Sequence, residues 1–241
     1  MMAPPGRVFR IGALALCAIA MLTGCVLSQA EVSPEGSLDV FSANSLGPNR
    51  TLPDDWVFES DGGGNARRNV NIETTAGTAT LTIKASANRF VMARRTKATL
   101  LASPYIGWSW RMGGQSGREA DIRLIVGFYG GNPESRSWGS EPLARLGTSL
   151  PPFDRAIAIL WGQSALERGS FSTTSAIPEY IARGGSEHLE KWWTDNLDLA
   201  DLYRKAWPND RFKRARIMFV GFAASADSGG EAQFGDIVLY R

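Results

Sequence analysis

The chain of 241 residues has few of the side chains on which most metal and catalytic sites depend. Histidine occurs once, as His188, which excludes zinc proteases that bind their metal through paired histidines. A Ser-His-Asp triad would need that same residue, and the sequence contains no Gly-x-Ser-x-Gly motif to present the serine. Cysteine occurs only as Cys17 and Cys25, so the residues after position 25 can form neither disulfides nor a catalytic thiolate.

Long hydrophobic runs are also scarce, and the most prominent one lies near the N-terminus. Residues 11–22 are an unbroken apolar run that follows Arg7 and Arg10, with no acidic residue before it. This order is typical of the n-region and h-region of a signal peptide. A helix of this length rises about 18 Å, less than the hydrocarbon core of about 30 Å. A cleaved signal peptide is therefore expected rather than a transmembrane anchor.

The apolar run ends in Leu22-Thr23-Gly24-Cys25, which resembles the lipobox of bacterial lipoproteins. The resemblance implies that residues 1–24 are removed and that Cys25 carries a diacylglyceryl group, which anchors the protein to a membrane of the cell envelope. Each buried methylene of such a chain contributes about 0.8 kcal/mol. The next residue is Val26 rather than an aspartate. In Gram-negative sorting an aspartate there retains a lipoprotein in the inner membrane, so the resemblance implies an outer-membrane protein facing the periplasm.

Neither charge sign is in excess once the signal peptide is removed. The whole chain has 26 basic and 24 acidic residues, and loss of Arg7 and Arg10 leaves 24 of each. Binding of nucleic acid through release of counterions therefore has no electrostatic support.

The remaining sequence alternates apolar and polar residues with a period of two. In residues 78–86, 105–112 and 121–128 one face of the strand is apolar throughout and the other is mainly polar, as in half-buried antiparallel strands. Further strands are expected at residues 38–42, 56–59, 70–74, 90–93, 156–161, 217–222 and 234–240. Strands without alternating helices predict an all-β fold, an antiparallel β-sandwich of the jelly-roll type. The expected organisation is a flexible tether at 25–37 and a single β-sandwich domain at 38–241.

One short helix is predicted in the C-terminal half. Leu199, Leu202, Tyr203 and Ala206 have helical spacing, and Pro208 ends the segment. Acidic and amide residues at its start and basic ones at its end fit the helix dipole. We place Asp195, Asn196 and Asp198 at that start and Arg204 and Lys205 at that end.

Several short motifs follow one another in a definite order along the chain. They are Tyr105-Ile106-Gly107-Trp108-Ser109-Trp110-Arg111, the 121–128 strand, Ala158-Ile159-Leu160-Trp161-Gly162, Trp192-Trp193-Thr194-Asp195-Asn196, Asp201-Leu202-Tyr203-Arg204-Lys205-Ala206-Trp207 and Phe234-Gly235-Asp236-Ile237. Taken in this order, the motifs resemble the bacterial domain of unknown function 3047. The resemblance spans residues 38–241, implies a β-sandwich similar to carbohydrate-binding modules, and brings no established activity with it. Where that family has a turn rich in threonine and aspartate, residues 223–230 contain a single acid, Asp227.

Eight tryptophans suggest a surface that stacks on sugar rings. Trp108 and Trp110 share a face with apolar neighbours and are expected in the core. Five residues remain as candidates for ligand binding: the tryptophans that lie in loop or polar context and the arginines that face away from the apolar stripes of their strands. These are Trp138, Trp192, Trp193, Arg111 and Arg123.

A metal site has weaker support. In carbohydrate-binding sandwiches an acid on the last strand often helps to hold a structural calcium, and Asp236 with Asp39 on the first strand could do so here. Calcium takes six to eight oxygen ligands, and only two carboxylates can be named. A hydrogen-bonded structural role for Asp236 is the alternative.

Three functions remain open from the sequence. The first is a non-catalytic, lipid-anchored protein that binds a ligand such as a polysaccharide or assists in the envelope. The second is a carbohydrate-active hydrolase or lyase that uses a pair of carboxylates. The third is a structural partner in an envelope assembly, for which an exposed apolar patch around Trp192 and Trp193 would be the sign.

The lipobox yields a direct prediction. The Cys25→Ser variant should leave the membrane fraction while its domain stays folded, because anchoring depends on acyl chains and no later cysteine can replace Cys25. Washed membrane pellets and circular dichroism measure the two properties. A variant that stays in the pellet like the wild type would contradict the lipoprotein interpretation.

Overall fold

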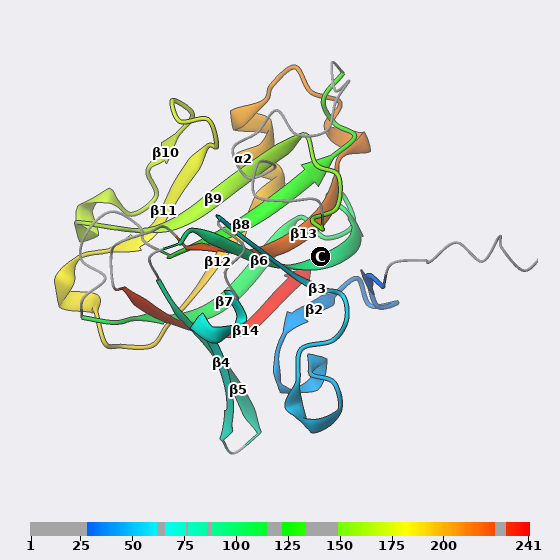
Figure 1. Ribbon diagram of the computed structural model, residues 1–241. Coiled ribbons are helices and arrows are strands. Elements are labelled where there is room, and N and C mark those ends of the chain that lie inside the picture. The colour runs from blue at the N-terminus through cyan, green and yellow to red at the C-terminus, as the bar shows by residue number, and fades with distance from the viewer. Residues whose placement is uncertain are drawn as a thin grey trace, which may run out of the picture.

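The computed structural model describes residues 28–61, 66–75, 77–85, 88–114, 122–133, 149–224 and 230–241. In these segments the strands form two sheets that pack face to face, with one α-helix at the end of the sandwich (Figure 1). The predicted fold class, a β-sandwich with one short helix, is confirmed. No helix of the described part is long and apolar enough to cross a membrane.

The first sheet has eight strands in the described segments. Its order is β1-β6-β13-β8-β9-β11-β10, and β3 also pairs with β6. Two of its pairings, β1 with β6 and β9 with β11, are parallel, and the others are antiparallel. The bounds are β1 Ala30–Glu31, β3 Trp56–Ser60, β6 Phe90–Thr99, β8 Ile122–Tyr129, β9 Arg155–Gly162, β10 Phe171–Ser172, β11 Glu179–Gly184 and β13 Arg216–Ala224.

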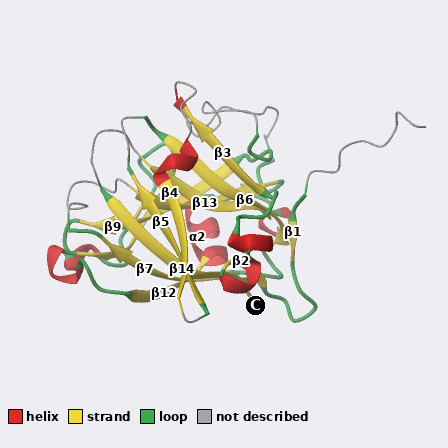
Figure 2. Cartoon of the chain, turned by 60° about the horizontal axis from the view of Figure 1, so that its bottom comes forward, coloured by secondary structure: helices red, strands yellow, loops and turns green. Residues whose placement is uncertain are grey.

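The second sheet has six strands in the same segments. Its order is β12-β7-β14-β5-β4, with β2 on β14, and all of its pairings are antiparallel. In Figure 2 strands β7, β12 and β14 run side by side, and β1 lies next to β6 at the opposite side of the molecule. The bounds are β2 Leu38–Phe41, β4 Val70–Thr75, β5 Thr78–Lys84, β7 Tyr105–Met112, β12 Trp193–Asp198 and β14 Glu231–Tyr240.

The main core fills the space between the sheets, as the alternation of apolar residues predicts. Trp108 and Trp110 are 1% and 0% exposed. Trp161 packs edge-on against Trp110 with ring centroids 5.2 Å apart. Each such ring buries about 150–250 Å². The expectation that Trp108 and Trp110 are core residues is confirmed.

Strand β6 continues beyond residue 93, where the sequence pattern predicted its end. The pattern was interrupted because two arginines follow at that point. Arg94 is buried beside Asp55, to which its Nε donates at 3.0 Å. Its Nη1 also donates to the carbonyl oxygens of Asp39 and Val40. Arg95 donates to the carbonyl of Ser149 at 2.9 Å. Because these partners stabilise the guanidinium groups inside the protein, the strand continues to Thr99.

Helix α2, Leu199–Ala206, begins at Asp198, whose carboxylate accepts the backbone N–H of Asp201 at 2.8 Å. The helix itself was predicted, but Asp195 and Asn196 lie in β12 rather than at the helix start. Asp195 and Leu197 face the buried side of the sandwich, and pairing with β7 holds them extended. A tertiary partner thus outweighed the local helical pattern.

The hydroxyl of Tyr203, a residue of α2, holds the helix against the end of the sandwich. That hydroxyl donates to Asp210 at 2.8 Å, and Asp210 also accepts two bonds from Arg155. Burial, reinforced by the carboxylate, raises the pKa of Tyr203 above its ordinary value. A Cβ on Gly131 would lie 2.0 Å from the tyrosine oxygen, so glycine is needed there.

The folded body begins before residue 38, the boundary expected from the sequence. Ala30 and Glu31 pair in parallel with Thr96 and Lys97 of β6, and the carboxylate of Glu31 accepts a bond from Lys97 at 3.0 Å. At least residues 30 and 31 of the expected tether are therefore part of the eight-stranded sheet. Cys25 and the expected signal peptide lie outside the described residues.

Candidate functional site

A pocket of about 500 Å³ opens on the outer face of the eight-stranded sheet, near its β10–β11 edge. Ligand pockets of small molecules commonly have volumes of about 300–1,000 Å³. Most side chains that line this pocket are polar. The lining consists of Arg123, Leu160, Trp161, Gly162, Gln163, Glu167, Ser172, Ser175, Glu179 and Ile181.

The floor of the pocket follows from strand alternation. Neighbouring strands place Leu124 opposite Ile159, and both point into the core between the sheets. The preceding residue Arg123 and the following residue Leu160 therefore point outward. Leu160 in turn pairs with Ile181 of β11. The floor thus has an apolar centre with a guanidinium at its side.

The turn between β9 and β10 forms one wall. It contains the short 3-10 helix η7, Ala165–Glu167, in which Ser164 caps the backbone N–H of Leu166 and Glu167 accepts the N–H of Ser164 at 3.2 Å. A Cβ on Gly162 would lie 2.6 Å from the Glu167 carboxylate, and one on Gly184 would lie 2.5 Å from the Ser164 carbonyl. These two glycines let the turn lie directly against β9 and β11.

Glu179 and Arg123 form the polar side of the pocket. Arg123 donates to one carboxylate oxygen of Glu179 at 3.0 Å, and Ser175 donates to the other at 3.3 Å. Both partners of the ion pair are about one-third exposed. Donors and acceptors thus surround an apolar floor, an arrangement suited to a ligand with several hydroxyl groups.

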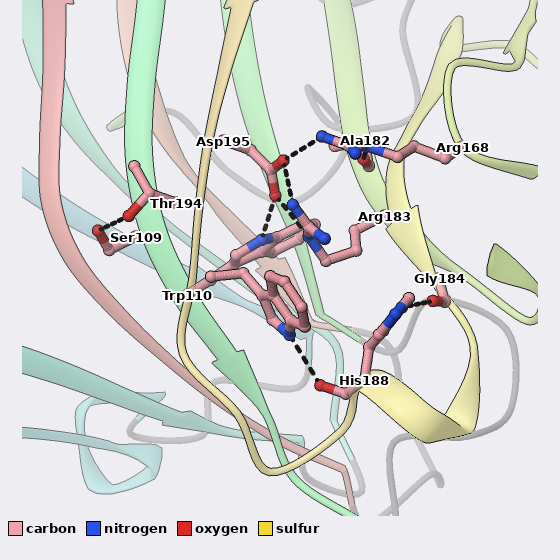
Figure 3. Close-up of polar contacts among 10 residues, drawn as sticks. Ser109, Trp110, Arg168, Ala182, Arg183, Gly184, His188, Thr194 and Asp195 are labelled. Carbon is pink, nitrogen blue, oxygen red and sulfur yellow. Dashed lines mark hydrogen bonds and ion pairs between the residues drawn. The ribbon is translucent and has the colours of Figure 1, made fainter.

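A buried polar cluster lies on the other side of β11 from the pocket. Its centre is the carboxylate of Asp195 on β12, whose side chain is 4% exposed. One oxygen accepts bonds from Trp110 Nε1 at 2.9 Å and Arg183 Nε at 3.0 Å (Figure 3). The other accepts from Arg183 at 2.8 Å and Arg168 at 3.1 Å. We call these four residues the Asp195 cluster.

A β-bulge makes the Asp195 cluster possible. The pairing of β11 with β9 shifts between Ile181 and Arg183, so that Arg183 lies opposite Trp161. In a regular strand Ile181 and Arg183 would point to the same face. The bulge lets Ile181 face the pocket while Arg183 turns inward to Asp195. Arg168 then binds the carbonyl of Ala182 at 3.2 Å and fixes the turn after η7.

The five candidate ligand residues do not line one groove. Arg123 lies in the pocket. Trp192 is 47% exposed on the outer face of the six-stranded sheet, where Arg111 also lies. Trp193 faces the other way: it stacks under the guanidinium of Arg183, 4.1 Å from the ring centroid, and donates to the carbonyl of His188. Trp138 is outside the described residues. Trp192 and Trp193 therefore form no common apolar patch.

The two residues proposed for calcium, Asp39 and Asp236, are both exposed. The Asp39 carboxylate accepts a hydrogen bond from Ser42. Asp236 is exposed in a bulge of β14, with φ of 47°. No group of three or more His, Cys, Asp or Glu side chains that could hold a metal gathers anywhere in the described segments.

Sequence reasoning missed most of the pocket. Glu179 and Ile181 belong to β11, which was not expected because the bulge removes the alternation from its sequence. Ser172 ends the two-residue strand β10, and Gln163, Glu167 and Ser175 lie in the connecting turns. One local signal existed, the Ser164-x-x-Glu167 spacing of a capping box.

No protein-family model matches the chain, and no curated protein matches it. The resemblance to the domain of unknown function 3047 thus remains a prediction. Among solved structures, the chain is similar to a family 11 carbohydrate-binding module of a Clostridium thermocellum cellulase, with 8% identity and a TM-score of 0.37 over 77% of this chain and 87% of that one.

Two further solved structures resemble the chain. One is endoglucanase 3 of Trichoderma harzianum, from family GH12, with 10% identity and a TM-score of 0.39 over 90% of this chain and 96% of that one. The other is the K2 cleaved adhesin domain of Lys-gingipain, also with 10% identity and a TM-score of 0.39, over 84% and 98% of the two chains. Similarity at these identities concerns the two-sheet arrangement alone.

The Asp195 cluster predicts a large loss of stability on truncation. Asp195→Ala should lower the free energy of unfolding by about 3–5 kcal/mol, because the buried Arg183 loses its counter-charge. Urea unfolding followed by circular dichroism measures the loss. Asp61→Ala, which removes an exposed ion pair with Arg89, is the control and should cost about 1 kcal/mol or less. Equal losses in the two variants would contradict a special role for Asp195.

The bulge in β14 predicts the opposite result at Asp236. Because its left-handed φ is strained for residues other than glycine, Asp236→Gly should leave the protein as stable as the wild type or up to about 1 kcal/mol more stable. Thermal unfolding measures the change, and Asp236→Val should be destabilising. A melting temperature of the wild type that falls with a chelator would instead restore the calcium hypothesis.

Proposed function

We propose that this protein is a lipid-anchored, non-catalytic polysaccharide-binding protein of the bacterial cell envelope. The single observation that carries the binding function is the pocket on the outer face of the eight-stranded sheet. The lipid anchor rests on the sequence of residues 7–25, with its two arginines, its apolar run and its lipobox-like end.

The chemistry of the pocket favours a sugar over other small ligands. Two carboxylates, a guanidinium, an amide and two serine hydroxyls offer both donors and acceptors within one pocket. Leu160 and Ile181 provide an apolar surface for the C–H face of a pyranose ring. The charge of Arg123 is balanced by Glu179, so the ligand need not be anionic.

The strand order also fits a protein held at its N-terminal end. β1 forms one edge of the eight-stranded sheet, and β11 and β10 form the other. Strands lie about 4.8 Å apart, so the pocket lies roughly 20 Å from β1 across the sheet. In Figure 1 the labels β10 and β11 and the N-terminal strand β2 stand on opposite sides of the molecule. A lipid at Cys25 would therefore be attached on the β1 side of the sheet, away from the edge that carries the pocket.

A hydrolase is the second candidate, because Glu167 and Glu179 line the same pocket. Each carboxylate is already engaged within the protein, Glu179 by Arg123 and Ser175 and Glu167 by the N–H of Ser164. Catalysis would require one of them to protonate a leaving group and the other to attack or to activate water. Their protein contacts favour a binding role.

The test is a glycan array probed with the full chain in detergent, followed by calorimetric titration of the glycans retained. Binding without release of new reducing ends is expected. Arg123→Ala and Glu179→Gln should each weaken binding about tenfold, the equivalent of about 1.4 kcal/mol. Arg89→Ala, which removes an exposed ion pair elsewhere, is the matched control and should bind like the wild type. Unchanged binding in both pocket variants would overturn the assignment, and product release that Glu179→Gln abolishes would favour the hydrolase.

A further inference from the structure

A second surface lies on the opposite side of the sandwich, on the outer face of the six-stranded sheet. The indole of Trp192 is 47% exposed there. It reaches from the β12 side across β7, so that its ring comes within 4.0 Å of the position that a Cβ on Gly235 of β14 would take. The indole thus lies over the outer face of β7 with about half of its surface open to solvent.

Polar side chains surround the exposed indole on the same face. Register places Ser109 between Thr194 and Gly235, and the two hydroxyls are 3.1 Å apart. Two residues further along β7, Arg111 donates to the side-chain oxygen of Gln233 at 3.1 Å. We call the set of Trp192, Ser109, Thr194, Arg111 and Gln233 the Trp192 platform.

A second aromatic group stands further along β7. Tyr105 is 38% exposed and stacks on Tyr240, with centroids 5.5 Å apart and an angle of 29° between the rings. The ring of Trp192 lies at the level of Ser109, which pairs with Gly235, and Tyr105 is four positions earlier on β7, about 13 Å along the strand. Between them the outer face carries Gly107, beside which the side chains of Val238 and Tyr240 lie. The two aromatic positions thus follow one another along β7.

The composition of this face favours a neutral glycan chain over the other possible occupants. A protein partner or a lipid surface needs a contiguous apolar patch, whereas the outer face between Trp192 and Tyr105 mixes Val238 with Gly107, Ser109 and Thr194. An anionic polymer needs an unbalanced cation, whereas Arg111 pairs with Glu190. Alternating ring faces and hydroxyl partners match a chain of uncharged sugars.

We propose that the Trp192 platform, together with Tyr105, is a second glycan-binding site that takes an extended, uncharged polysaccharide along β7. The proposal rests on the polysaccharide-binding function but uses residues that do not line the pocket. The two sites lie on opposite outer faces, so they can be removed one at a time.

The experiment is affinity electrophoresis of the full chain in detergent, through gels that contain hydroxyethyl cellulose, mixed-linkage β-glucan, arabinoxylan or the acidic polygalacturonate. We expect at least one neutral polymer to retard the wild type. Trp192→Ala should weaken that retardation about tenfold, Trp192→Phe should weaken it less, and Tyr105→Ala should also weaken it, because an extended chain contacts both aromatic side chains. Tyr129→Ala is the matched control, because Tyr129 is 40% exposed at the end of β8 in the other sheet. Circular dichroism and melting temperature confirm that each variant is folded.

Each outcome has one meaning for the platform. If Trp192→Ala migrates like the wild type in every gel, or if Tyr129→Ala loses as much retardation, the platform is overturned. If Trp192→Ala weakens binding and Arg123→Ala does not, the platform stands and the pocket assignment fails. Loss in Arg123→Ala alone supports the pocket and overturns the platform. A wild type that none of the polymers retards overturns the second site, while the array still tests the pocket.

Discussion

The buried carboxylate of Asp195 is the constraint on which the arrangement of the two sheets around the pocket depends. It lies on β12 of one sheet, and its main partner Arg183 lies on β11 of the other. A carboxylate at 4% exposure is costly unless charged donors surround it. Four hydrogen bonds from Trp110, Arg168 and Arg183 meet that requirement. These contacts fix how the two sheets pack against each other at this position.

A buried ion pair of this kind specifies structure more than it adds stability. Well-packed apolar residues often replace such pairs at no cost, whereas removal of one partner is severe. Here the pair requires the bulge in β11, since without it Arg183 would face outward beside Ile181. The same bulge allows Ile181 to line the pocket while Arg168 holds the turn after η7. The buried ion pair between Asp195 and Arg183 therefore influences the shape of the pocket without lining it.

Sequence patterns predicted the strands in which every second residue is apolar. Those at β5, β7 and β8 were placed within two residues of their ends. The patterns failed where charge enters the interior: β6 was cut short before Arg94 and Arg95, β11 was missed, and part of β12 was assigned to the helix start. In each case the partner that makes burial tolerable lies far away in the sequence, such as Asp55 for Arg94. The pocket was difficult to predict for a related reason. Arg123 could be identified because it faces away from an apolar stripe, whereas Glu179 depends on a parallel pairing that no local pattern encodes.

The alternation that builds the core also determines which surfaces remain for ligands. On the eight-stranded sheet a second apolar cluster, including Phe153 and Phe219, occupies much of the outer face, so polar side chains gather at the β9–β11 end. On the six-stranded sheet the outward residues of β7 are Tyr105, Gly107, Ser109 and Arg111. Strand β7 contributes side chains to both sides of its sheet. Trp110 points inward from it to Asp195, while its neighbours Ser109 and Arg111 face solvent. One strand thus anchors the interior ion pair that shapes the pocket and carries the exposed platform on its other side.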